Sequence, residues 1–482
     1  MKWSIVSHAA RRGGIAALGF LAIAASAAAR VLPAEVEQAL RKANVPQDAL
    51  VVVLQDAGST SSRLSWQPQL PVNPASLTKL ITTYAALDLF GPAWSWTTPV
   101  WLQGKVDSDG VLDGNLVIKG SGDPKLVQER LWLLLRRVQQ AGVREIRGDI
   151  VLDRSAFDVP EQSAADFDGE PLKPYNVRPD ALMLNYKSLV LTFTPDIPRG
   201  VATVGADPTL AGFRVDTTVP LVATPCDDWR GALKPELGEP ATLHFNGSYA
   251  LACGEKQWPL AFPDAKGYNA RVLEGMWAEM GGRLGGKVRE GIAPPITPSF
   301  EVSSPPLAEL IRDINKYSNN MMAQQLFLTM GMVFEPSAHG VGTPEAGRQV
   351  LHRWLIERLG DSAGETVIDN GSGLSRETRI SAQTLARLLQ LAWSGPLMPE
   401  LMSSLPVSGI DGTLVRSRAP QGRAHLKTGS LRDVVGIAGY VLGNSGRRQV
   451  LVAIINHPNA GAARPVLDAL VHWAAQDQRR AD

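Results

Sequence analysis

Cysteine is nearly absent from this chain. Only Cys226 and Cys253 occur among 482 residues, and neither belongs to a CxxC pair or to a cluster of cysteine and histidine. The spacing that zinc sites need is therefore missing, and we expect no metal and no other cofactor. In an exported chain the two thiols pair most simply with each other as a disulfide, with two buried free thiols as the alternative.

An excess of charge of either sign is also lacking. Lysine and arginine number 48 and aspartate and glutamate 47, which leaves a formal net charge of +1. A nucleic-acid partner would call for a basic excess, and a disordered tail for a block of like charges. Neither is present, so we expect a globular protein without nucleic-acid binding. Its length exceeds what one hydrophobic core usually supports, which predicts two or more domains.

Long apolar runs are missing after the first thirty residues. Near the start, "IAALGFLAIAA" follows three basic residues and is too short to span a bilayer comfortably. The small residues "ASAAA" come next. We therefore predict a cleaved secretory signal over 1–29, with cleavage between Ala27 and Ala29 and an uncleaved anchor as the alternative. The mature protein is then expected in the periplasm without a transmembrane anchor, with loose membrane association left open.

The predicted secondary structure of the rest of the chain changes in character twice. A buried strand is predicted over 49–56 and a helix over 75–90, whose apolar residues recur at helical spacing and predict one broad buried face. Short strands and turns dominate from about 94 to 290. Helices resume at 306, and three strands and a last helix follow 424. Strands at both ends with helices between them predict an α+β domain that a β-rich insertion interrupts.

The segment "PASLTK" places Ser76 and Lys79 three residues apart at the start of the predicted helix. Residues i and i+3 lie on the same helix face, so the two side chains project together. A neutral lysine can take the proton of a serine, and burial beside another cation would lower the lysine pKa enough for that. The Ser76 N–H at the helix N-terminus would also face a reacting carbonyl. The alternative is an N-cap serine with a solvated lysine behind it.

A second motif, "YSNN", interrupts the helical run that begins near 306. It contains Ser318 and Asn320. A break between two helices can aim a hydroxyl and a carboxamide into a cleft, and these are the groups that an acyl-transfer site needs beside its nucleophile.

A third motif, "HLKTGS", lies on a predicted strand near the C-terminus. In an extended strand Lys427 and Gly429 share one face and Thr428 points to the other. Gly429 is expected to leave room for a ligand backbone to approach, and Ser430 follows it. His425 is expected to be an ordinary strand residue, because no motif partner accompanies it.

Each of the three motifs occurs once, and their order along the chain is SxxK, SxN, KTG. The three motifs, their order and the elements that are expected to carry them resemble the penicillin-binding proteins and serine β-lactamases. The GxSxG motif of an α/β-hydrolase is absent from the sequence. A separation of 242 residues between Ser76 and Ser318 is much longer than in the β-lactamases and the simpler carboxypeptidases. With "LVIKGSGDP", "LMLNY" and "DNGSGLSR", it resembles the low-molecular-mass class C penicillin-binding proteins, the D-alanyl-D-alanine carboxypeptidase/endopeptidases.

The resemblance covers essentially the whole chain after the signal and implies its architecture. The expected fold is α+β, with a DD-transpeptidase-like domain in which helices cover both faces of an antiparallel sheet. Two β-rich domains, one nested in the other, would interrupt it. The expected boundaries are 30–93 and 294–482 for the catalytic domain, 94–187 and 263–293 for inserted domain II, and 188–262 for nested domain III.

The resemblance also implies a mechanism. Ser76 would attack the carbonyl of the penultimate D-alanine with Lys79 as base, and Ser318 would relay the proton to the leaving amine. Water would then hydrolyse the acyl-enzyme, which returns the serine to its starting state.

Four further residues take roles by the same resemblance. Asn320 would hold the substrate amide, and Lys427 would supply positive potential. Thr428 and Ser430 would bind the terminal carboxylate, with the oxyanion between the N–H groups of Ser76 and Ser430.

Three residues match family positions that contact the diaminopimelate side chain: Asp153, Phe157 and Arg376. Their chemistry suits a zwitterion, because arginine binds a carboxylate and aspartate an ammonium group. The alternatives are that Asp153 forms a turn after a strand, that Phe157 belongs to a core and that Arg376 pairs within the protein.

The function expected from these motifs is that of a serine DD-peptidase. It would remove terminal D-alanine from peptidoglycan stem peptides, cleave crosslinks to diaminopimelate and be acylated by β-lactams. One alternative is a penicillin- or peptidoglycan-binding protein with little turnover. Another is a β-lactamase, although no deacylating base on an extra loop is apparent. The balance of the two peptidase activities and the oligomeric state are left open, with a homodimer among the alternatives.

Overall fold

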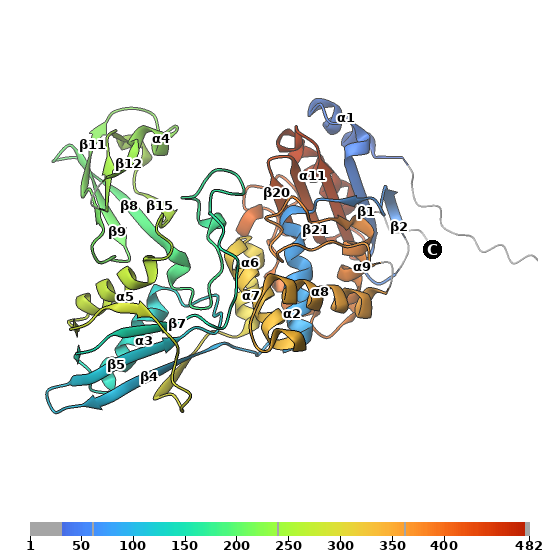
Figure 1. Ribbon diagram of the computed structural model, residues 1–482. Helices are drawn as coiled ribbons and strands as arrows, with labels where there is room; N and C mark the ends of the chain where they lie inside the picture. The colour runs from blue at the N-terminus through green and yellow to red at the C-terminus, as the bar shows by residue number, and fades with distance from the viewer. Residues whose placement is uncertain (1–30, 60–61, 239–240, 361–362, 478–482) are drawn as a thin grey trace, which may run out of the picture.

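The computed structural model describes residues 31–59, 62–238, 241–360 and 363–477. The predicted signal over 1–29 lies outside the described residues, so its cleavage stays a prediction. A part that holds most of the helices and a β-rich part lie side by side in Figure 1, at the right and the left of the view. In the described ranges no helix has the length and apolar content to cross a membrane.

A five-stranded antiparallel sheet forms the centre of the helix-rich part, in the order β2-β1-β22-β21-β20. Its strands are β1 (Leu50–Asp56), β2 (Ser62–Trp66), β20 (Ala424–Leu431), β21 (Val434–Leu442) and β22 (Arg448–Asn456). The first strand of the chain therefore pairs with the last. The central strands are buried on both faces, which explains their almost unbroken runs of valine, leucine and isoleucine. β20 is an edge strand, and a short pair, β3 (Pro71–Val72) with β19 (Ile380–Ser381), lies apart from the sheet.

Helices cover both faces of this sheet, as predicted. On one face lie α1 (Ala34–Lys42) and α11 (Arg464–Ala475), and on the other α2 (Thr78–Phe90) and α9 (Ala382–Ser394). The remaining helices of this part are α6 (Leu307–Lys316), α7 (Asn320–Phe334), α8 (Pro344–Leu359) and α10 (Met398–Ser404). The helices α6, α7 and α8 contact α2, so α2 is the central helix of the domain (Figure 1).

The central helix α2 is buried on all sides, so the expectation of one buried face is wrong. Every residue from 78 to 87 is buried. Its polar side chains are accommodated by hydrogen bonds within the domain: Thr82 Oγ1 donates to the carbonyl of Gly371 at 2.6 Å, and Thr83 Oγ1 to that of Lys79 at 2.7 Å. The sequence pattern failed here because short polar residues with local partners tolerate full burial.

The insertion between α2 and α6 contains a seven-stranded sheet, in the order β16-β6-β5-β4-β18, in which β7 also pairs with β5 and β17 pairs with β7. Its strands are β4 (Thr97–Val106), β5 (Val111–Lys119), β6 (Glu145–Ile146), β7 (Ile150–Asp153), β16 (Arg283–Leu284), β17 (Val288–Glu290) and β18 (Phe300–Ser303). The helices α3 (Gln128–Gln140) and α5 (Tyr268–Glu279) pack with them. Because β18 pairs with β4, this sheet extends past residue 293, where the predicted boundary lies. The Gly/Pro-rich stretch near 291–300 is a connection within the insertion and not its end.

A second β-rich unit has strands from Ser188 to Ala261, and its status as a separate nested domain over 188–262 stays a prediction. Its first sheet comprises β8 (Ser188–Asp196), β9 (Val201–Asp207), β11 (Thr218–Val222), β14 (Tyr249–Ala250) and β15 (Lys256–Ala261). Its second comprises β10 (Arg214–Val215), β12 (Pro235–Gly238) and β13 (Thr242–Phe245), and α4 (Trp229–Leu233) lies nearby. One continuous apolar cluster contains Leu116 and Leu134 of the first unit and Phe193 and Tyr249 of the nested one. The two inserted units therefore share a core.

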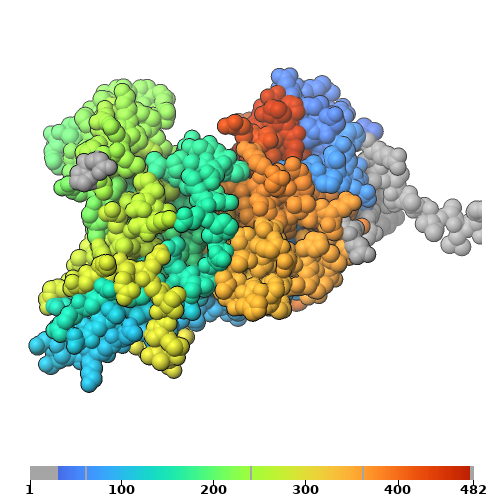
Figure 2. Space-filling view, in the orientation of Figure 1, coloured from blue at the N-terminus to red at the C-terminus, as the bar shows by residue number. Residues whose placement is uncertain are grey.

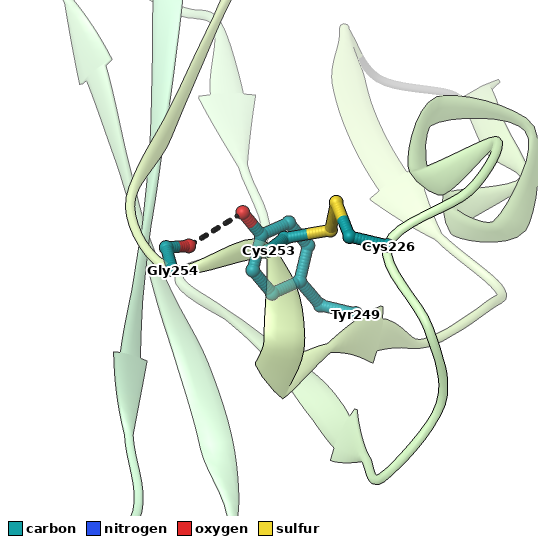
Figure 3. Close-up of a disulfide and its surroundings, with 4 residues drawn as sticks. All are labelled: Cys226, Tyr249, Cys253 and Gly254. Atoms are coloured by element: carbon teal, nitrogen blue, oxygen red, sulfur yellow. Dashed lines mark hydrogen bonds between the residues drawn. A yellow bond between two sulfur atoms is a disulfide. The ribbon is translucent and has the colours of Figure 1, made fainter.

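Cys226 and Cys253 form a disulfide in the nested unit, which confirms the prediction. The bond lies beside Tyr249, whose hydroxyl donates to the carbonyl of Gly254 at 2.8 Å (Figure 3). The two cysteines are 27 residues apart, a loop whose closure restricts the unfolded chain.

Replacing both cysteines by serine should lower the stability of the nested unit by about 2–4 kcal/mol. Catalytic activity at low temperature should change little, because the disulfide is not in the part that contains Ser76. Thermal unfolding with and without reductant measures the first effect, and steady-state kinetics the second. An unchanged melting temperature would contradict the stabilising role, and a matching loss of activity would contradict the separation of the two parts.

Candidate active site

Ser76 lies in a 3-10 turn, Ala75–Leu77, that leads directly into α2. The predicted helix start is therefore a tighter turn, although Ser76 and Lys79 still share a face. Ala75 has a φ of 48° and its carbonyl accepts a hydrogen bond from Thr78 Oγ1 at 2.9 Å. A Cβ at Gly373 would lie 1.9 Å from that carbonyl oxygen. Only glycine at this position lets the loop around it lie directly on the serine turn.

Asn73 attaches the serine turn to two distant segments. Its backbone N–H donates to Asn456 Oδ1 at 2.8 Å, and Asn456 Nδ2 donates back to its carbonyl at 2.9 Å. Its own Nδ2 donates to the carbonyl of Ser375, and its Oδ1 accepts from the N–H of Ala75, both at 2.9 Å. The turn is thereby held against β22 and the 370s loop. Nothing in the local sequence distinguishes this asparagine from any turn residue.

Lys79 is fully buried, and its Nζ contacts three oxygens. Ser76 Oγ lies at 3.0 Å, Asn320 Oδ1 at 2.7 Å and the carbonyl oxygen of Ser372 at 2.5 Å. Burial lowers the pKa of Lys79 well below its ordinary value, and the nearby Lys427 lowers it further. In the neutral amine, the two N–H groups donate to Asn320 Oδ1 and to the carbonyl oxygen of Ser372, which can only accept hydrogen bonds. The lone pair then faces the Ser76 hydroxyl, as a general base requires.

The second motif forms the link between α6 and α7. Ser318 has a left-handed backbone with φ of 57°, which turns the chain sharply between the two helices. The Asn319 side chain caps α7 by accepting from the N–H of Met322 at 3.0 Å. Asn320 is the first residue of α7, so its position is set by the cap. Its Nδ2 donates to the carbonyl of Tyr175 at 3.2 Å.

The third motif lies on the edge strand β20, with Lys427 and Gly429 on one face as predicted. Lys427 Nζ donates to Ser318 Oγ at 2.8 Å and to the carbonyl of Thr428 at 2.7 Å. A Cβ at Gly429 would lie 2.6 Å from the carbonyl oxygen of Pro74. The space that this glycine leaves is therefore occupied by the protein's own serine turn. The expectation that it admits a ligand backbone on this side is wrong.

Thr428 and Ser430 alternate with these residues and point toward the α11 face. The Thr428 hydroxyl donates to Thr413 Oγ1 at 2.7 Å, and Ser430 Oγ accepts from Arg464 Nη2 at 2.9 Å. Neither partner carries a sequence signal. The three motifs thus meet at one place, where α2 begins, α7 begins and β20 forms the edge of the sheet.

Burial lowers the pKa of Lys427 to about 7. The unfolded chain binds an extra proton between pH 7 and the ordinary lysine value, so this group makes the native state less stable at neutral pH than at high pH. Lys427→Met should therefore raise stability by about 0.5–2 kcal/mol near pH 7 while it impairs catalysis. The gain should shrink as the pH rises. Melting temperatures over about pH 6–9 measure it, with the exposed Lys105→Met as control. A lower melting temperature than wild type at pH 7 would contradict it.

Groups that would indicate other chemistry do not assemble near this site. No set of three or more histidine, cysteine, aspartate or glutamate residues could hold a metal ion in the described part of the chain. His425 lies on β20, where it pairs with Tyr440 of β21 and bridges to Val407. It is an ordinary strand residue in this structure.

The sequence profile of the D-Ala-D-Ala carboxypeptidase 3 (S13) family matches residues 32–477. This chain belongs to that family. It is therefore a serine hydrolase of the D-alanyl-D-alanine carboxypeptidase class, and the recognition of the family from three short motifs is confirmed.

Relatives and solved structures agree with this assignment. A D-alanyl-D-alanine carboxypeptidase DacB of Haemophilus influenzae is 24% identical over 407 residues, which cover 80% of this chain and 81% of the relative. A D-alanyl-D-alanine carboxypeptidase of Actinomadura sp. strain R39 is 29% identical over 413 residues, covering 81% and 74%. The crystal structure of penicillin binding protein 4 (dacB) from Haemophilus influenzae superposes with a TM-score of 0.71 at 21% identity, covering 90% of this chain and 99% of that one. That protein was also solved in complex with a β-lactam. The predicted fold class is confirmed.

Asp153 of this S13 enzyme is buried at the end of β7. Its side chain is 0% exposed, and its carboxylate accepts from the N–H groups of Ser155 at 2.9 Å and Ala293 at 2.8 Å. Lys119 Nζ lies 3.8 Å away. These bonds agree with the alternative of a turn after a strand, and a contact of Asp153 with diaminopimelate stays an untested prediction. The signal "DRSAFD" shows a local turn, and only the tertiary structure shows that the turn is buried.

Phe157 is held between two glycines. A Cβ at Gly122 would lie 2.3 Å from its ring, and one at Gly342 would lie 2.6 Å from it. The ring packs against the main apolar cluster of the catalytic domain while remaining partly exposed. It closes the joint between the insertion and the catalytic domain, and a contact with substrate stays a prediction.

Arg376 lies beside an acidic and an aromatic residue that the sequence did not indicate. Its guanidinium stacks over the ring of Phe167 at 4.9 Å and pairs with Asp433 at 2.9 Å. Asp168 accepts from the Tyr175 hydroxyl at 2.8 Å, and the charge of Arg376 helps to lower its pKa against the effect of burial. The carboxylate and aromatic ring near Arg376 therefore come from 167–168, about ten residues beyond the predicted pair.

A cavity of about 430 Å³ opens where these residues meet. It lies between the inserted segment 159–179, the middle of α7 and the loop 369–377. In Figure 2 the inserted segment, in teal, lies directly against the orange part of the catalytic domain. Side chains of both signs line the cavity: Arg178, Arg348, Arg376, Asp166, Asp369 and Glu377.

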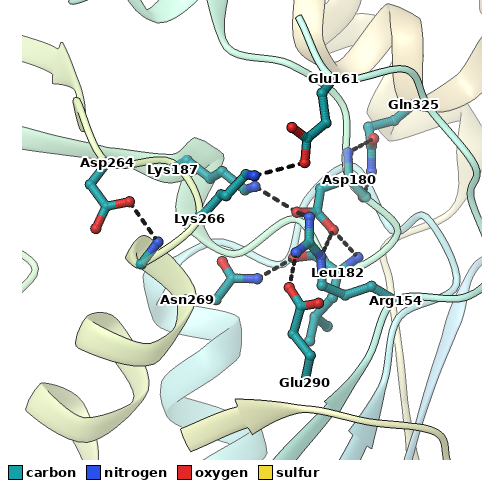
Figure 4. Close-up of polar contacts among 11 residues, drawn as sticks. Arg154, Glu161, Asp180, Leu182, Lys187, Asp264, Lys266, Asn269, Glu290 and Gln325 are labelled. Carbon is teal, nitrogen blue, oxygen red and sulfur yellow. Dashed lines mark hydrogen bonds and ion pairs between the residues drawn. The ribbon is translucent and has the colours of Figure 1, made fainter. Parts of the chain in front are cut away.

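A buried polar network attaches the same inserted segment to α7 (Figure 4). Asp180 is buried and pairs with Arg154 at 2.6 Å and Lys187 at 2.5 Å. Burial alone would raise the pKa of Asp180, but the two cations outweigh it and the pKa lies below its usual range. Gln325 of α7 accepts from the Asp180 N–H at 3.0 Å and donates to its carbonyl at 2.8 Å. Since α7 begins with Asn320, the insertion helps to place a residue of the catalytic cluster.

Proposed function

We propose that this S13 enzyme removes terminal D-alanine from peptidoglycan stem peptides and cleaves D-alanine–diaminopimelate crosslinks through an acyl-enzyme on Ser76. The single observation that carries the proposal is the position of Lys79, whose buried Nζ contacts Ser76 Oγ and Asn320 Oδ1 together. A lysine with a strongly lowered pKa beside a serine hydroxyl suits acyl transfer and has no evident structural purpose.

Acylation follows from the hydrogen bonds of this cluster. Ser76 Oγ attacks the carbonyl carbon of the penultimate D-alanine while its proton passes to Lys79. The oxyanion lies between the N–H groups of Ser76 and Ser430. When the C–N bond breaks, Ser318 delivers a proton to the leaving amine, and the neighbouring Lys427 at 2.8 Å orients its hydroxyl. The proton that Lys79 took from Ser76 then replaces the one that Ser318 gave away, so Lys79 is neutral again and Ser318 regains its hydroxyl.

Deacylation reverses these steps with water in place of the amine. Lys79, again neutral, takes a proton from water, whose oxygen attacks the ester carbon. The bond to Ser76 Oγ breaks and the serine regains its proton. The same residues therefore serve both half-reactions, and the products are free D-alanine or an uncrosslinked peptide and the shortened acyl donor.

The cavity beside Arg376 supports a zwitterionic side chain in the acyl donor. Arg376 would bind the distal carboxylate of diaminopimelate and Asp168 its ammonium group, because Asp153 is buried. Phe167 and Tyr175 would contact the aliphatic part. Since Arg376 already pairs with Asp433, the ligand carboxylate would share that guanidinium rather than meet an unpaired charge.

We place this activity in the periplasm. The signal-like pattern at the N-terminus, the disulfide and the bacterial carboxypeptidase relatives support this location. The complex of the Haemophilus influenzae protein with a β-lactam supports acylation of Ser76 by the same class of inhibitor.

The test is mass spectrometry of purified muropeptides after incubation with the enzyme, with and without penicillin. Pentapeptides should lose one D-alanine and crosslinked dimers should become monomers, and penicillin should block both reactions. Recovery of intact pentapeptides and dimers would refute the proposal. Stable penicillin labelling without any product would indicate a binding protein instead, and rapid nitrocefin turnover a β-lactamase.

A further inference from the structure

The strand β20 presents two hydroxyl groups on its α11 face, and each has a partner from another segment. Thr428 and Ser430 are two residues apart and therefore point the same way. Thr413 holds the first at 2.7 Å and Arg464 the second at 2.9 Å. Four polar groups from three distant segments thus meet along the exposed edge of the sheet.

The residues predicted to bind the substrate carboxylate lack a permanent positive charge. Thr428 and Ser430 are neutral. Lys427 is fully buried, points to the opposite face of the strand toward Ser318, and has a pKa near 7. Its lowered pKa means that its positive charge is incomplete at neutral pH. A carboxylate at this edge needs a cation from elsewhere to be bound strongly.

Arg464 supplies such a cation. It is the first residue of α11, its side chain reaches Ser430, and it is exposed to solvent. In the part of the chain that the structure describes, no carboxylate pairs with it, whereas Arg376 pairs with Asp433. A guanidinium stays charged at every physiological pH and has several N–H groups beyond the one given to Ser430.

Thr413 is held in place by an ion pair whose lysine is buried and whose aspartate is partly exposed. Two residues before it, Asp411 pairs with Lys316 at 2.5 Å and accepts from the N–H of Val407 at 2.8 Å. A Cβ at Gly412 would lie 2.5 Å from the carbonyl oxygen of Lys316, so the two backbones touch. Lys316 precedes Ser318 by two residues. The ion pair therefore fixes the Thr413 hydroxyl relative to the catalytic loop.

We propose that Arg464 and Thr413 bind the carboxylate on the carbon that bears the leaving amine, together with Thr428 and Ser430. Terminal D-alanine has such a carboxylate, and so does the diaminopimelate centre that donates its amine to a crosslink. Both reactions of the proposed function, on which this inference rests, would use the same four residues. Arg464 and Thr413 would select leaving groups that end in a free acid.

The test compares two peptides that differ only in the last group, a D-alanyl-D-alanine acid and its C-terminal amide. Arg464→Gln should lower kcat/KM for the acid about 10- to 100-fold through KM, because a charged hydrogen bond is lost, and leave the amide unchanged. Arg464→Lys should restore most of the preference for the acid. Thr413→Val should cost the acid about 2- to 10-fold, and Thr413→Ser little.

The control is Arg41→Gln, at an exposed arginine of α1. It should leave both substrates unchanged. Equal losses on acid and amide in Arg464→Gln would overturn the proposal, since they would show that Arg464 acts only by orienting Ser430. An unchanged ratio of acid to amide would overturn it as well.

A second readout separates this inference from the proposed function. Acylation rates with benzylpenicillin and with its methyl ester need no peptide turnover. If the wild type releases no D-alanine but prefers the free acid of penicillin, and Arg464→Gln removes that preference, the proposed function fails and the carboxylate site stands. If Arg464→Gln keeps the preference, the carboxylate site fails whatever the peptide result.

Discussion

Ser76→Ala should lower kcat/KM for D-alanine release by at least about 10⁴-fold and abolish covalent labelling by penicillin. No other hydroxyl contacts the Lys79 amine in the described residues, so no replacement nucleophile has an activating base. The fold should persist, because the Ser76 side chain makes its hydrogen bond to Lys79 only and the turn is held by Asn73. Product release and intact-protein mass after penicillin treatment measure both effects.

The matched control is Ser403→Ala, at an exposed serine of α10 whose hydroxyl contacts only a backbone carbonyl of its own helix. It should behave as wild type in both assays. Penicillin labelling that survives Ser76→Ala would identify a different nucleophile. A large drop in melting temperature would mean that the loss of activity has a structural cause.

Lys79→Arg should lower kcat/KM about 10²- to 10⁴-fold, although it keeps the positive charge and nearly the length of the side chain. Arginine cannot lose its proton in the accessible range, so Ser76 would have no base. In the wild type the base acts in its neutral form. Because the pKa of Lys79 is lowered, kcat/KM should rise as the pH increases through that pKa, and this rise should vanish in Lys79→Arg.

The pH profile distinguishes this role from a structural one. Lys79→Met and Lys79→Arg should both lose the rise of kcat/KM with increasing pH, although only Lys79→Met removes the positive charge. Lys79 and Lys427 interact, so the observed midpoint belongs to the pair. If kcat/KM of Lys79→Arg still rises with pH around the wild-type midpoint, the titrating group is Lys427. That result would contradict the assignment of Lys79 as the base.

The inserted segment has a larger part in the site than a substrate platform alone would need. The carbonyl of Tyr175 accepts from Asn320 Nδ2, and the carbonyl and N–H of Asp180 bind Gln325 on the same helix. Asn320 also contacts the Lys79 amine at 2.7 Å. One catalytic carboxamide thus has a partner on each side, one in the catalytic domain and one in the insertion. This explains why the insertion can shape both recognition and catalysis.

Local chemistry in the sequence was enough to predict the disulfide and the contact between Ser76 and Lys79, whose roles as nucleophile and base stay predictions. Ser76 and Lys79 are three residues apart, and a helical turn brings such a pair together wherever it occurs. The 3-10 turn in place of a regular helix start did not change that. The order of the motifs and the long separation between Ser76 and Ser318 were enough to predict the family, because the separation shows where an insertion interrupts the catalytic domain.

What the sequence misassigned lies where distant segments meet. Asp153 ends β7 and Asp168 lies in the loop after it, and no local pattern tells which of the two is buried. The space at Gly429 is filled by Pro74, more than 300 residues earlier in the chain. Asn73, Thr413 and Arg464 have ordinary side chains that become special only through their partners.

The sequence by itself therefore determined the contact between Ser76 and Lys79, the family and the class of fold. Only the tertiary structure decided which carboxylates accompany Arg376, which glycine faces protein rather than ligand, and which cation at the edge of β20 has no carboxylate partner among the described residues. The physical reason is the range of the forces. The geometry of helices and strands depends on a few neighbouring residues, so the local sequence pattern is enough to predict it. Burial, ion pairing and pKa depend on every segment packed nearby, and those segments come together only in the folded chain.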